Sequence, residues 1–300
     1  MSGWLATLAR PWDALASPLL RPPRAGDDAC LSSQLLEVEG RAVRLSHRVA
    51  QAGAPTVVLL PGYPDTLQIF ARVAAALPPA TGYVALDFPG QGRSEPSRVP
   101  TYSPADRARW LVEVLEALAV DRCWLMAHDM GAHAALELAR LDPRRVERVV
   151  LSHALLDGAA RTSRAIAVLR RARAYRALLP GFPRATVARS IATFLPPETP
   201  LSSAIYDDVA STFTIASART TVAVCDATEV WLARGLARFA SLPMPLTLLW
   251  GDAEAHFPRV HAERLAAVVK RARVVDVRGG WHWLAWQDPD CIVAALANTA

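Results

Sequence analysis

Short apolar runs that alternate with helical patterns constrain the fold of this chain more than any other feature. Each run ends in glycine, proline or a polar residue, which is typical of parallel strands buried on both faces. The runs cover residues 56–62, 83–90, 122–129, 148–155, 246–252 and 272–280. Helical patterns lie between them at residues 67–77, 103–120, 131–142 and 259–271. This alternation predicts right-handed crossovers, so we expect an α/β fold with a doubly wound, mostly parallel sheet and helices on both faces.

Two segments depart from this rhythm. Residues 34–48 alternate apolar and polar side chains around Glu39 and Gly40, a pattern that predicts an antiparallel hairpin. Residues 157–241 contain no comparable strand run, and proline-rich stretches break their helical patterns, so we expect an inserted helical cap. The predicted organisation is an N-terminal extension at 1–30, a core formed by 31–156 and 242–300, and a cap at 157–241.

Composition and charge exclude several classes of function. With 300 residues and 52% hydrophobic content, the chain can bury one large core that carries an inserted subdomain. Its formal net charge of +5 comes from arginine, because Lys270 is the only lysine. We interpret the densest basic run, at 170–176, as a solvated helix face. No interleaving of aromatic and glycine residues indicates nucleic-acid binding, and no feature specifies an oligomeric state.

Cysteine and histidine spacing gives no metal-binding pattern. The four cysteines are Cys30, Cys123, Cys225 and Cys291. They lie far apart without a CxxC pair, which indicates reduced, mostly packed thiols in a cytoplasmic protein. His128 and His133 are five positions apart, so they do not repeat the i, i+4 face of HExxH sites. We therefore expect no bound metal.

Residues 1–30 form the predicted N-terminal extension. They lack a basic leading region, and charged residues interrupt their apolar stretch, so we expect neither a signal peptide nor a membrane span. The spacing of Trp4, Leu5, Leu8 and Trp12 predicts a short amphipathic helix. Docking of this helix on the rest of the protein is favoured, and weak contact with a membrane surface is the alternative.

Asp129 stands at the centre of a turn built from small residues, between the predicted strand 122–129 and the predicted helix 131–142. Ala127 precedes it by two positions and Gly131 follows by two. Small neighbours let the strand and helix backbones approach closely while the central residue is held in a strained conformation. The carboxylate should therefore lie above the strand ends at a helix N-terminus, where free N–H groups favour an anion.

Five motifs occur in an order that resembles a known family. They are PGYP at 61–64, DFPGQGRSE at 87–95, the turn at 127–131, WGDAEAHFP at 250–258 and GGWHW at 279–283. In this order they resemble the α/β-hydrolase superfamily. A central aspartate in the turn is similar to the branch that contains epoxide hydrolases and haloalkane dehalogenases.

The resemblance implies a catalytic triad in the order nucleophile, acid, histidine. Asp129 would be the nucleophile, Glu254 the acid and His282 the base. Two other acids remain open as partners of the histidine. Asp252 lies two residues before Glu254, and Asp157 follows the predicted strand at 148–155.

The chemistry explains why an aspartate suits this position. A carboxylate can displace a leaving group from saturated carbon and form an ester on the enzyme. His282, oriented by Glu254, would then deprotonate the water that attacks this ester. The backbone N–H groups of Tyr63 and Met130 are the expected donors to the tetrahedral oxyanion.

Three positions differ from the family pattern. Pro61 stands where the family usually has histidine, so the side-chain hydrogen bonds of that loop must be rebuilt. Met130 and Tyr63 occupy positions where many dehalogenases place halide-binding side chains. These differences favour an epoxide over a haloalkane as substrate.

An epoxide also needs an acid that protonates the opening oxygen. Epoxide hydrolases use two cap tyrosines for this, and the predicted cap contains only Tyr175 and Tyr206. His153 and His256 are the alternative acids at the rim of the cleft. Trp281 lies next to the base, so it is a candidate for the pocket wall, with packing of the last helix as the alternative.

We therefore expect a hydrolase that acts on a small, mainly apolar molecule. No nucleotide cofactor is expected, because Glu95 stands where GxGxxG would need its last glycine. Three alternatives stay open: a haloalkane dehalogenase-like enzyme, a hydrolase of another strained electrophile such as a lactone, and a ligand-binding homologue with weak or no catalysis.

Overall fold

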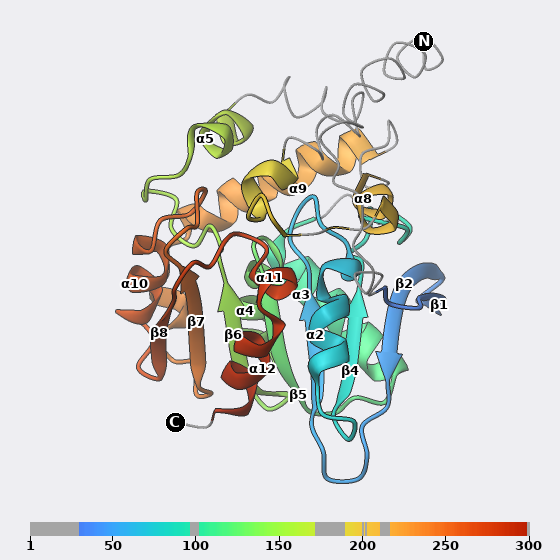
Figure 1. Ribbon diagram of the computed structural model, residues 1–300. Helices are drawn as coiled ribbons and strands as arrows, with labels where there is room; N and C mark the ends of the chain where they lie inside the picture. The colour runs from blue at the N-terminus through green and yellow to red at the C-terminus, as the bar shows by residue number, and fades with distance from the viewer. Residues whose placement is uncertain are drawn as a thin grey trace.

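An eight-stranded sheet forms the centre of the molecule (Figure 1). The computed structural model describes residues 30–96, 102–171, 190–199, 201, 203–210 and 217–298. In their order across the sheet, the strands are β1 (Gln34–Val38), β2 (Arg41–Arg48), β4 (Gly82–Leu86), β3 (Thr56–Leu60), β5 (Cys123–His128), β6 (Val146–Ser152), β7 (Leu246–Gly251) and β8 (Ala272–Val277).

Pairing of the strands confirms the predicted sheet. β1 and β2 form an antiparallel hairpin, and β2 is also antiparallel to β4. All pairs from β4 to β8 are parallel. The hairpin turns at Glu39 and Gly40, with φ angles of 49° and 70°, as expected for a two-residue connection. The carboxyl ends of the parallel strands therefore share one edge of the sheet, where ligands bind in open α/β folds.

Helices cover both faces of the sheet. The elements in these layers are η2 (Leu67–Phe70), α2 (Ala71–Ala76), α3 (Pro104–Ala117), α4 (Gly131–Leu141), α10 (Val260–Ala266), α11 (Leu284–Gln287) and α12 (Pro289–Ala297). α3, α4 and α10 share one core with Val58 and Leu60 of β3, whereas α2, α11 and α12 share the other with Val57 and Leu59. Alternate residues of one strand thus bury into opposite layers, as the apolar runs predicted.

The described elements between β6 and β7 are all helical. They are α5 (Arg164–Arg171), α8 (Ser203–Ala210), α9 (Ser217–Ala233) and η4 (Ala237–Phe239). α5, α8 and α9 lie above the carboxyl ends of the strands (Figure 1). Most of the predicted N-terminal extension lies outside the described residues.

A buried ion-pair network attaches α8 to the sheet. Arg44 of β2 contacts Asp87 at 3.2 Å and Asp208 of α8 at 2.8 Å. The hydroxyl of Thr66 donates to Asp208 over 2.6 Å. Because all these groups are buried, removal of one partner would leave a charge uncompensated. The network therefore fixes one helix above the strand ends.

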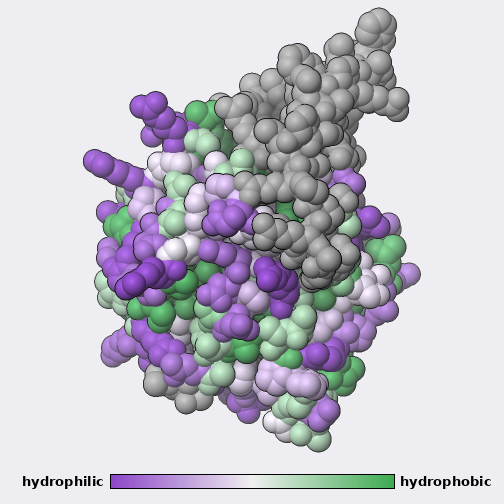
Figure 2. Space-filling model, viewed as in Figure 1, coloured by the Kyte–Doolittle hydropathy of each residue, from purple (hydrophilic) through white to green (hydrophobic). Residues whose placement is uncertain are grey.

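In the view of Figure 2, the described residues that are visible show polar and apolar side chains interspersed. Among the described helices, none has the length and apolar content to cross a bilayer. Cys30, Cys123, Cys225 and Cys291 form no disulfide among the described residues, and Cys123 and Cys225 are buried.

Candidate active site

The turn at Asp129 has the strained geometry that its sequence predicts. It joins β5 to α4, and Asp129 has a φ of 47°, in the left-handed region that side chains rarely adopt. A Cβ atom on Gly131 would lie 2.4 Å from the carbonyl oxygen of Leu60, and one on Gly62 would lie 2.5 Å from Cβ of Asp129. Glycine is therefore required at both positions, because an added Cβ would overlap backbone oxygens at Gly131 and the side chain of Asp129 at Gly62.

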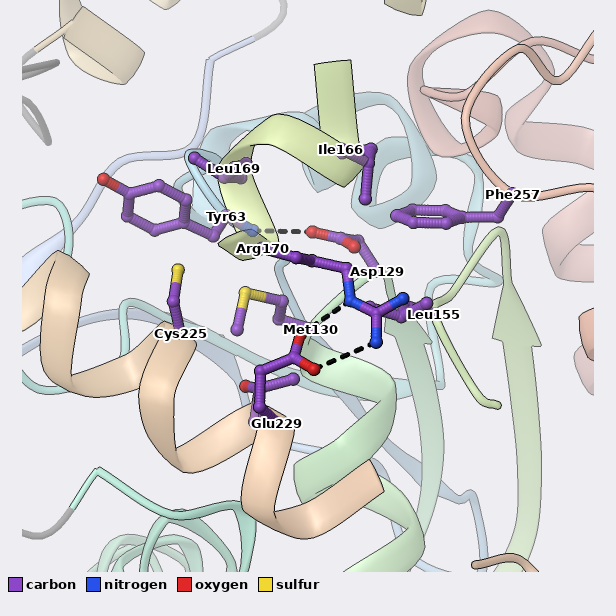
Figure 3. Close-up of a pocket in the computed structure, with 11 residues that line it drawn as sticks. Tyr63, Asp129, Met130, Leu155, Ile166, Leu169, Arg170, Cys225, Glu229 and Phe257 are labelled. Atoms are coloured by element: carbon purple, nitrogen blue, oxygen red, sulfur yellow. Dashed lines mark hydrogen bonds and ion pairs between the residues drawn. The ribbon is translucent and has the colours of Figure 1, made fainter. Parts of the chain in front are cut away.

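Two backbone donors hold the Asp129 carboxylate. The N–H of Tyr63 donates to Oδ2 over 3.0 Å, and the N–H of Met130 also bonds the carboxylate. Burial raises the pKa of Asp129, while His282 and these two donors oppose that rise. The side chain nevertheless reaches a cavity, as Figure 3 shows. The two predicted oxyanion donors thus both bond the Asp129 carboxylate.

Gln91 orients the peptide that carries one of these donors. Its side-chain amide donates to the carbonyl oxygen of Gly62 over 3.1 Å. The same peptide unit presents the N–H of Tyr63 to Asp129. Because Pro61 has no side-chain donor, Gln91 supplies a hydrogen bond that this loop needs. The sequence motifs alone do not identify Gln91 as a residue of the site. Its position between Gly90 and Gly92 is the feature that could have drawn attention to it.

His282 and Glu254 form a buried pair. Nδ1–H of His282 donates to Oε2 of Glu254 over 2.8 Å. Oε1 of Glu254 accepts the N–H groups of His256 at 2.5 Å and Phe257 at 3.1 Å. Burial would raise the pKa of Glu254, but His282 lowers it most, followed by His153 and the N–H of His256, so the pKa lies below its ordinary value.

The same pair sets the protonation of the imidazole. Burial alone would lower the pKa of His282, but Glu254 raises it most, followed by Asp129 and Asp65, so the net shift is upward. The bond from Nδ1–H leaves Nε2 as the nitrogen that can exchange a proton. This arrangement suits a base that activates water.

The two rival acids are engaged elsewhere. Asp252 accepts the N–H of Gly279 over 2.6 Å. Asp157 pairs with Arg264 over 2.6 Å, and this pair lowers the pKa of the carboxyl against the effect of burial. Of the three acids that the sequence left open, Glu254 is the one that the structure places against His282.

His153 lies beneath the His282–Glu254 pair. Its Nδ1–H donates to the carbonyl oxygen of His282 over 3.0 Å, and its Nε2 accepts the N–H of Gly251 over 2.7 Å. Burial lowers the pKa of His153 to about 4, so the ring is neutral. Both nitrogens are used to connect the end of β7 to the histidine loop. His153 therefore positions the loop and does not reach the cavity as an acid.

Asp65 adds a third buried carboxylate to the site, beside Asp129 and Glu254. Its Oδ1 accepts the indole N–H of Trp283 over 2.9 Å, and its Oδ2 lies 3.4 Å from Nε2 of His128. Burial, followed by repulsion from Asp129, raises the pKa of Asp65 to about 7. The ring of His128 lies 4.5 Å from that of His282. Asp65 follows PGYP directly, which was the sequence signal for this residue.

The other predicted pocket residues lie apart from Asp129. Tyr206 is fully buried in the core beside α2, and Trp281 is half-buried, with its N–H bonded to Gln287. His256 bonds Ser163 at 3.1 Å and Thr193 at 3.0 Å. Neither these three residues nor His153 are among the described residues that line the cavity. Tyr175 lies outside the described residues.

The cavity above Asp129 is small and mainly apolar. It has a volume of about 50 Å³, and we call it the inner cavity. Its described lining consists of Tyr63, Asp129, Met130, Leu155, Ile166, Leu169, Arg170, Cys225, Thr228, Glu229 and Phe257 (Figure 3). The lining combines the carboxylate from the sheet edge with side chains of α5 and α9.

One group of described residues has the donor atoms of a metal site. His153, Glu254 and His282 place one ligand atom each within 4.8 Å of one another. However, Nδ1 of His153 and Nδ1 of His282 each donate a proton to an oxygen, so neither offers a lone pair. The hydrogen bonding of this group therefore fits a triad better than a metal site.

Curated relatives share part or most of this chain. "Putative carbamate hydrolase RutD" of Pseudomonas savastanoi pv. phaseolicola is 33% identical over 36% of this chain, and the match spans 42% of that protein. An uncharacterized protein of Mycobacterium tuberculosis is 27% identical over 90% of this chain and 81% of its own length. A 2-hydroxy-6-oxononadienedioate/2-hydroxy-6-oxononatrienedioate hydrolase of Paraburkholderia phymatum is 34% identical over 37% of this chain and 40% of its own. The chain thus spans less than half of two of these relatives.

Solved structures share the whole architecture at low identity. Cfl2 from Burkholderia cenocepacia has a TM-score of 0.76 and 23% identity over 92% of this chain and 98% of its own. Haloalkane dehalogenase DbeA from Bradyrhizobium elkani has a TM-score of 0.72 and 20% identity, with 89% and 96% covered. A "putative epoxide hydrolase" from Pseudomonas aeruginosa has the same TM-score and identity, with 92% and 96% covered. The profile of the alpha/beta hydrolase fold family matches residues 55–289, so the chain belongs to the α/β-hydrolase family.

Proposed function

We propose that this protein is a hydrolase that forms an ester between Asp129 and a small, mainly apolar substrate, with an epoxide as the leading substrate class. One observation carries the proposal. The Asp129 carboxylate lines a cavity while two backbone N–H groups bond it, and a buried His282–Glu254 pair lies close enough to couple to it electrostatically.

Ester formation is the first step. An Asp129 oxygen attacks a ring carbon, the carbon–oxygen bond of the epoxide breaks, and its electron pair goes to the ring oxygen, which takes a proton from an acid. Tyr175 stays a predicted acid, because the other three candidates, Tyr206, His153 and His256, are not among the described residues that line the inner cavity.

Ester hydrolysis is the second step. His282 takes a proton from water, whose oxygen attacks the carboxyl carbon of Asp129. The N–H groups of Tyr63 and Met130 stabilise the resulting oxyanion. When the tetrahedral species collapses, the ester bond breaks, the product oxygen recovers a proton from His282, and the diol leaves.

Oxygen labelling tests the proposal. In a single turnover in ¹⁸O-water, one labelled oxygen should enter the Asp129 carboxylate, detected by mass spectrometry of the peptide that contains it. A screen of epoxides and haloalkanes identifies the leaving group, and Asp129→Ala should lose all turnover, whereas Asp252→Asn should keep it. An active enzyme with no label in Asp129 contradicts the ester mechanism.

A ligand-binding role is the second candidate. The inner cavity holds about 50 Å³, and no tyrosine apart from Tyr63 is among its described lining residues. These features favour a binding protein that has lost the acid for ring opening. Thermal stabilisation by epoxides without turnover, unchanged in His282→Ala, would support this role over catalysis.

A further inference from the structure

A second cavity lies next to the inner cavity, and one ion pair belongs to both. The described lining of this outer cavity is Gly158, Ala159, Ala160, Arg161, Thr162, Ala167, Arg170, Arg171 and Glu229. Arg170 and Glu229 are the two described residues that line both cavities. The side chains of this pair therefore form a partition between the Asp129 carboxylate and the outer cavity.

The Arg170–Glu229 ion pair that forms the partition has good hydrogen-bond geometry but can be broken. Nε of Arg170 donates to Oε1 of Glu229 over 2.6 Å, and a terminal nitrogen donates to Oε2 over 2.9 Å (Figure 3). Arg170 extends from α5 and Glu229 from α9, so the pair joins two separate helices. The side chain of Arg170 is 20% exposed and that of Glu229 is 36% exposed. An ion pair with this exposure adds little net stability, so another anion can replace the carboxylate of Glu229.

The inner cavity is too small for a substrate unless the Arg170–Glu229 ion pair opens. A volume of about 50 Å³ accommodates a few water molecules at most, whereas ligand pockets usually measure several hundred Å³. The outer cavity measures about 420 Å³. A substrate that occupied both cavities would gain the missing space if the side chains of the partition moved.

The charge of the outer cavity indicates which ligand it favours. Its described lining includes three arginines, Arg161, Arg170 and Arg171, and one acidic residue, Glu229. Guanidinium groups bind carboxylates through paired N–H donors. The inner cavity is mainly apolar, apart from Asp129 and this ion pair. The two chambers together match a molecule with an apolar reacting end and an anionic end.

We propose that the substrate is an amphipathic organic acid whose carboxylate binds in the outer cavity and replaces Glu229 as the partner of Arg170, while its apolar end reaches Asp129. This inference rests on the proposed function, because it assigns the substrate class of the same site. Arg161 and Arg171 attract the acid, and the exchange at Arg170 opens the partition. A small molecule is favoured over an acidic protein or a membrane, because only a small molecule can extend through the partition.

Binding of a matched pair of unreactive probes tests the proposal without turnover. Octanoate and octanamide have the same chain and differ in charge, and titration calorimetry gives their dissociation constants. Octanoate should bind about tenfold more tightly than octanamide at low salt, and this preference should shrink as ionic strength rises. Equal affinities, or no binding of octanoate, would overturn the proposal.

Variants distinguish binding of octanoate in the outer cavity from a general effect of positive charge. Arg161→Gln combined with Arg171→Gln should weaken octanoate binding about tenfold and leave octanamide binding unchanged. Arg164→Gln is the control, because it removes an exposed arginine of α5, the helix that carries Arg171, outside the described lining of the outer cavity. The control removes one charge and the double variant two, so a loss of binding free energy in the control that is half of that in the double variant would show that only overall charge matters.

Glu229→Gln tests the exchange at the partition. Loss of the competing carboxylate should tighten octanoate binding about threefold, because Arg170 then has no internal ion pair to break. A purely structural ion pair predicts a lower melting temperature with no gain in affinity. If Glu229→Gln fails to fold, the Arg161 and Arg171 double variant still decides the proposal.

Turnover distinguishes failure of this inference from failure of the proposed function. An epoxide that bears a carboxylate should have a higher kcat/KM than its methyl ester, and the double variant should abolish the difference. Labelling of Asp129 by the neutral ester without any acid preference would retain the mechanism and reject the substrate class. We expect neither an acidic peptide nor phosphatidylglycerol vesicles to displace octanoate. Displacement by either one would indicate that the site binds an acidic protein or a membrane and would overturn the proposal.

Discussion

The side-chain amide of Gln91 and the carbonyl oxygen of Gly62 are joined by a hydrogen bond of 3.1 Å. Through this bond, the loop after β4 fixes the peptide that donates to the Asp129 carboxylate. The proposed oxyanion site therefore depends on a residue that touches no reacting atom.

Gln91→Ala should lower kcat/KM about a hundredfold, the lower end of the cost of losing one oxyanion donor. The peptide would keep its position less precisely, because its carbonyl would lose its side-chain partner. Steady-state kinetics measure the effect, with Gln51→Ala on the exposed surface as the control. Activity within twofold of the wild type would show that the peptide is held without Gln91.

Glu254→Gln should lower kcat about a thousandfold, because the neutral amide no longer stabilises the imidazolium of His282. Ester hydrolysis depends on His282 more than ester formation does, so the Asp129 ester should accumulate. Intact-protein mass spectrometry after mixing with substrate detects it as a mass increase. Asp252→Asn and Asp157→Asn are the controls, and a comparable loss in either would reassign the acid.

Asp65→Asn should change how stability depends on pH. The folded pKa of Asp65 is raised to about 7 from 3.8 by burial, so between these values the folded state holds a proton that the unfolded chain releases. The wild type should thus lose stability as pH rises through this window, and the variant should not. Urea unfolding at pH 5 and pH 8 should show the variant gaining relative to the wild type at pH 8. The same difference at both pH values would mean that Asp65 does not titrate in this range.

Gly131→Ala should destabilise the fold by about 3 kcal/mol, because its Cβ would overlap the carbonyl oxygens of Leu60 and Pro61. Gly53→Ala is a matched control, since Gly53 has a φ of 81° but no atom within 4 Å of an added Cβ. The control should cost only about 1 kcal/mol, the usual penalty for a left-handed residue. Chemical denaturation of both variants measures the difference, and equal costs would argue against the close approach at the turn.

Local sequence patterns determined the strands of the sheet and the turn that carries Asp129. Buried parallel strands need continuous apolar runs, and a sharp strand-to-helix turn needs small residues, so both features are local and can be read directly. The hairpin at Glu39 and Gly40 follows for the same reason, because its turn chemistry lies within a few residues.

Only the tertiary structure decided which residues share the site. It placed Glu254 rather than Asp252 or Asp157 against His282, and it buried Tyr206 and His153 away from the inner cavity. It also brought together Gln91 with Gly62, and Arg170 with Glu229, which are 29 and 59 positions apart. Spacing along the chain carries no information about such pairs, because their distances depend on how separate loops and helices pack over the sheet edge.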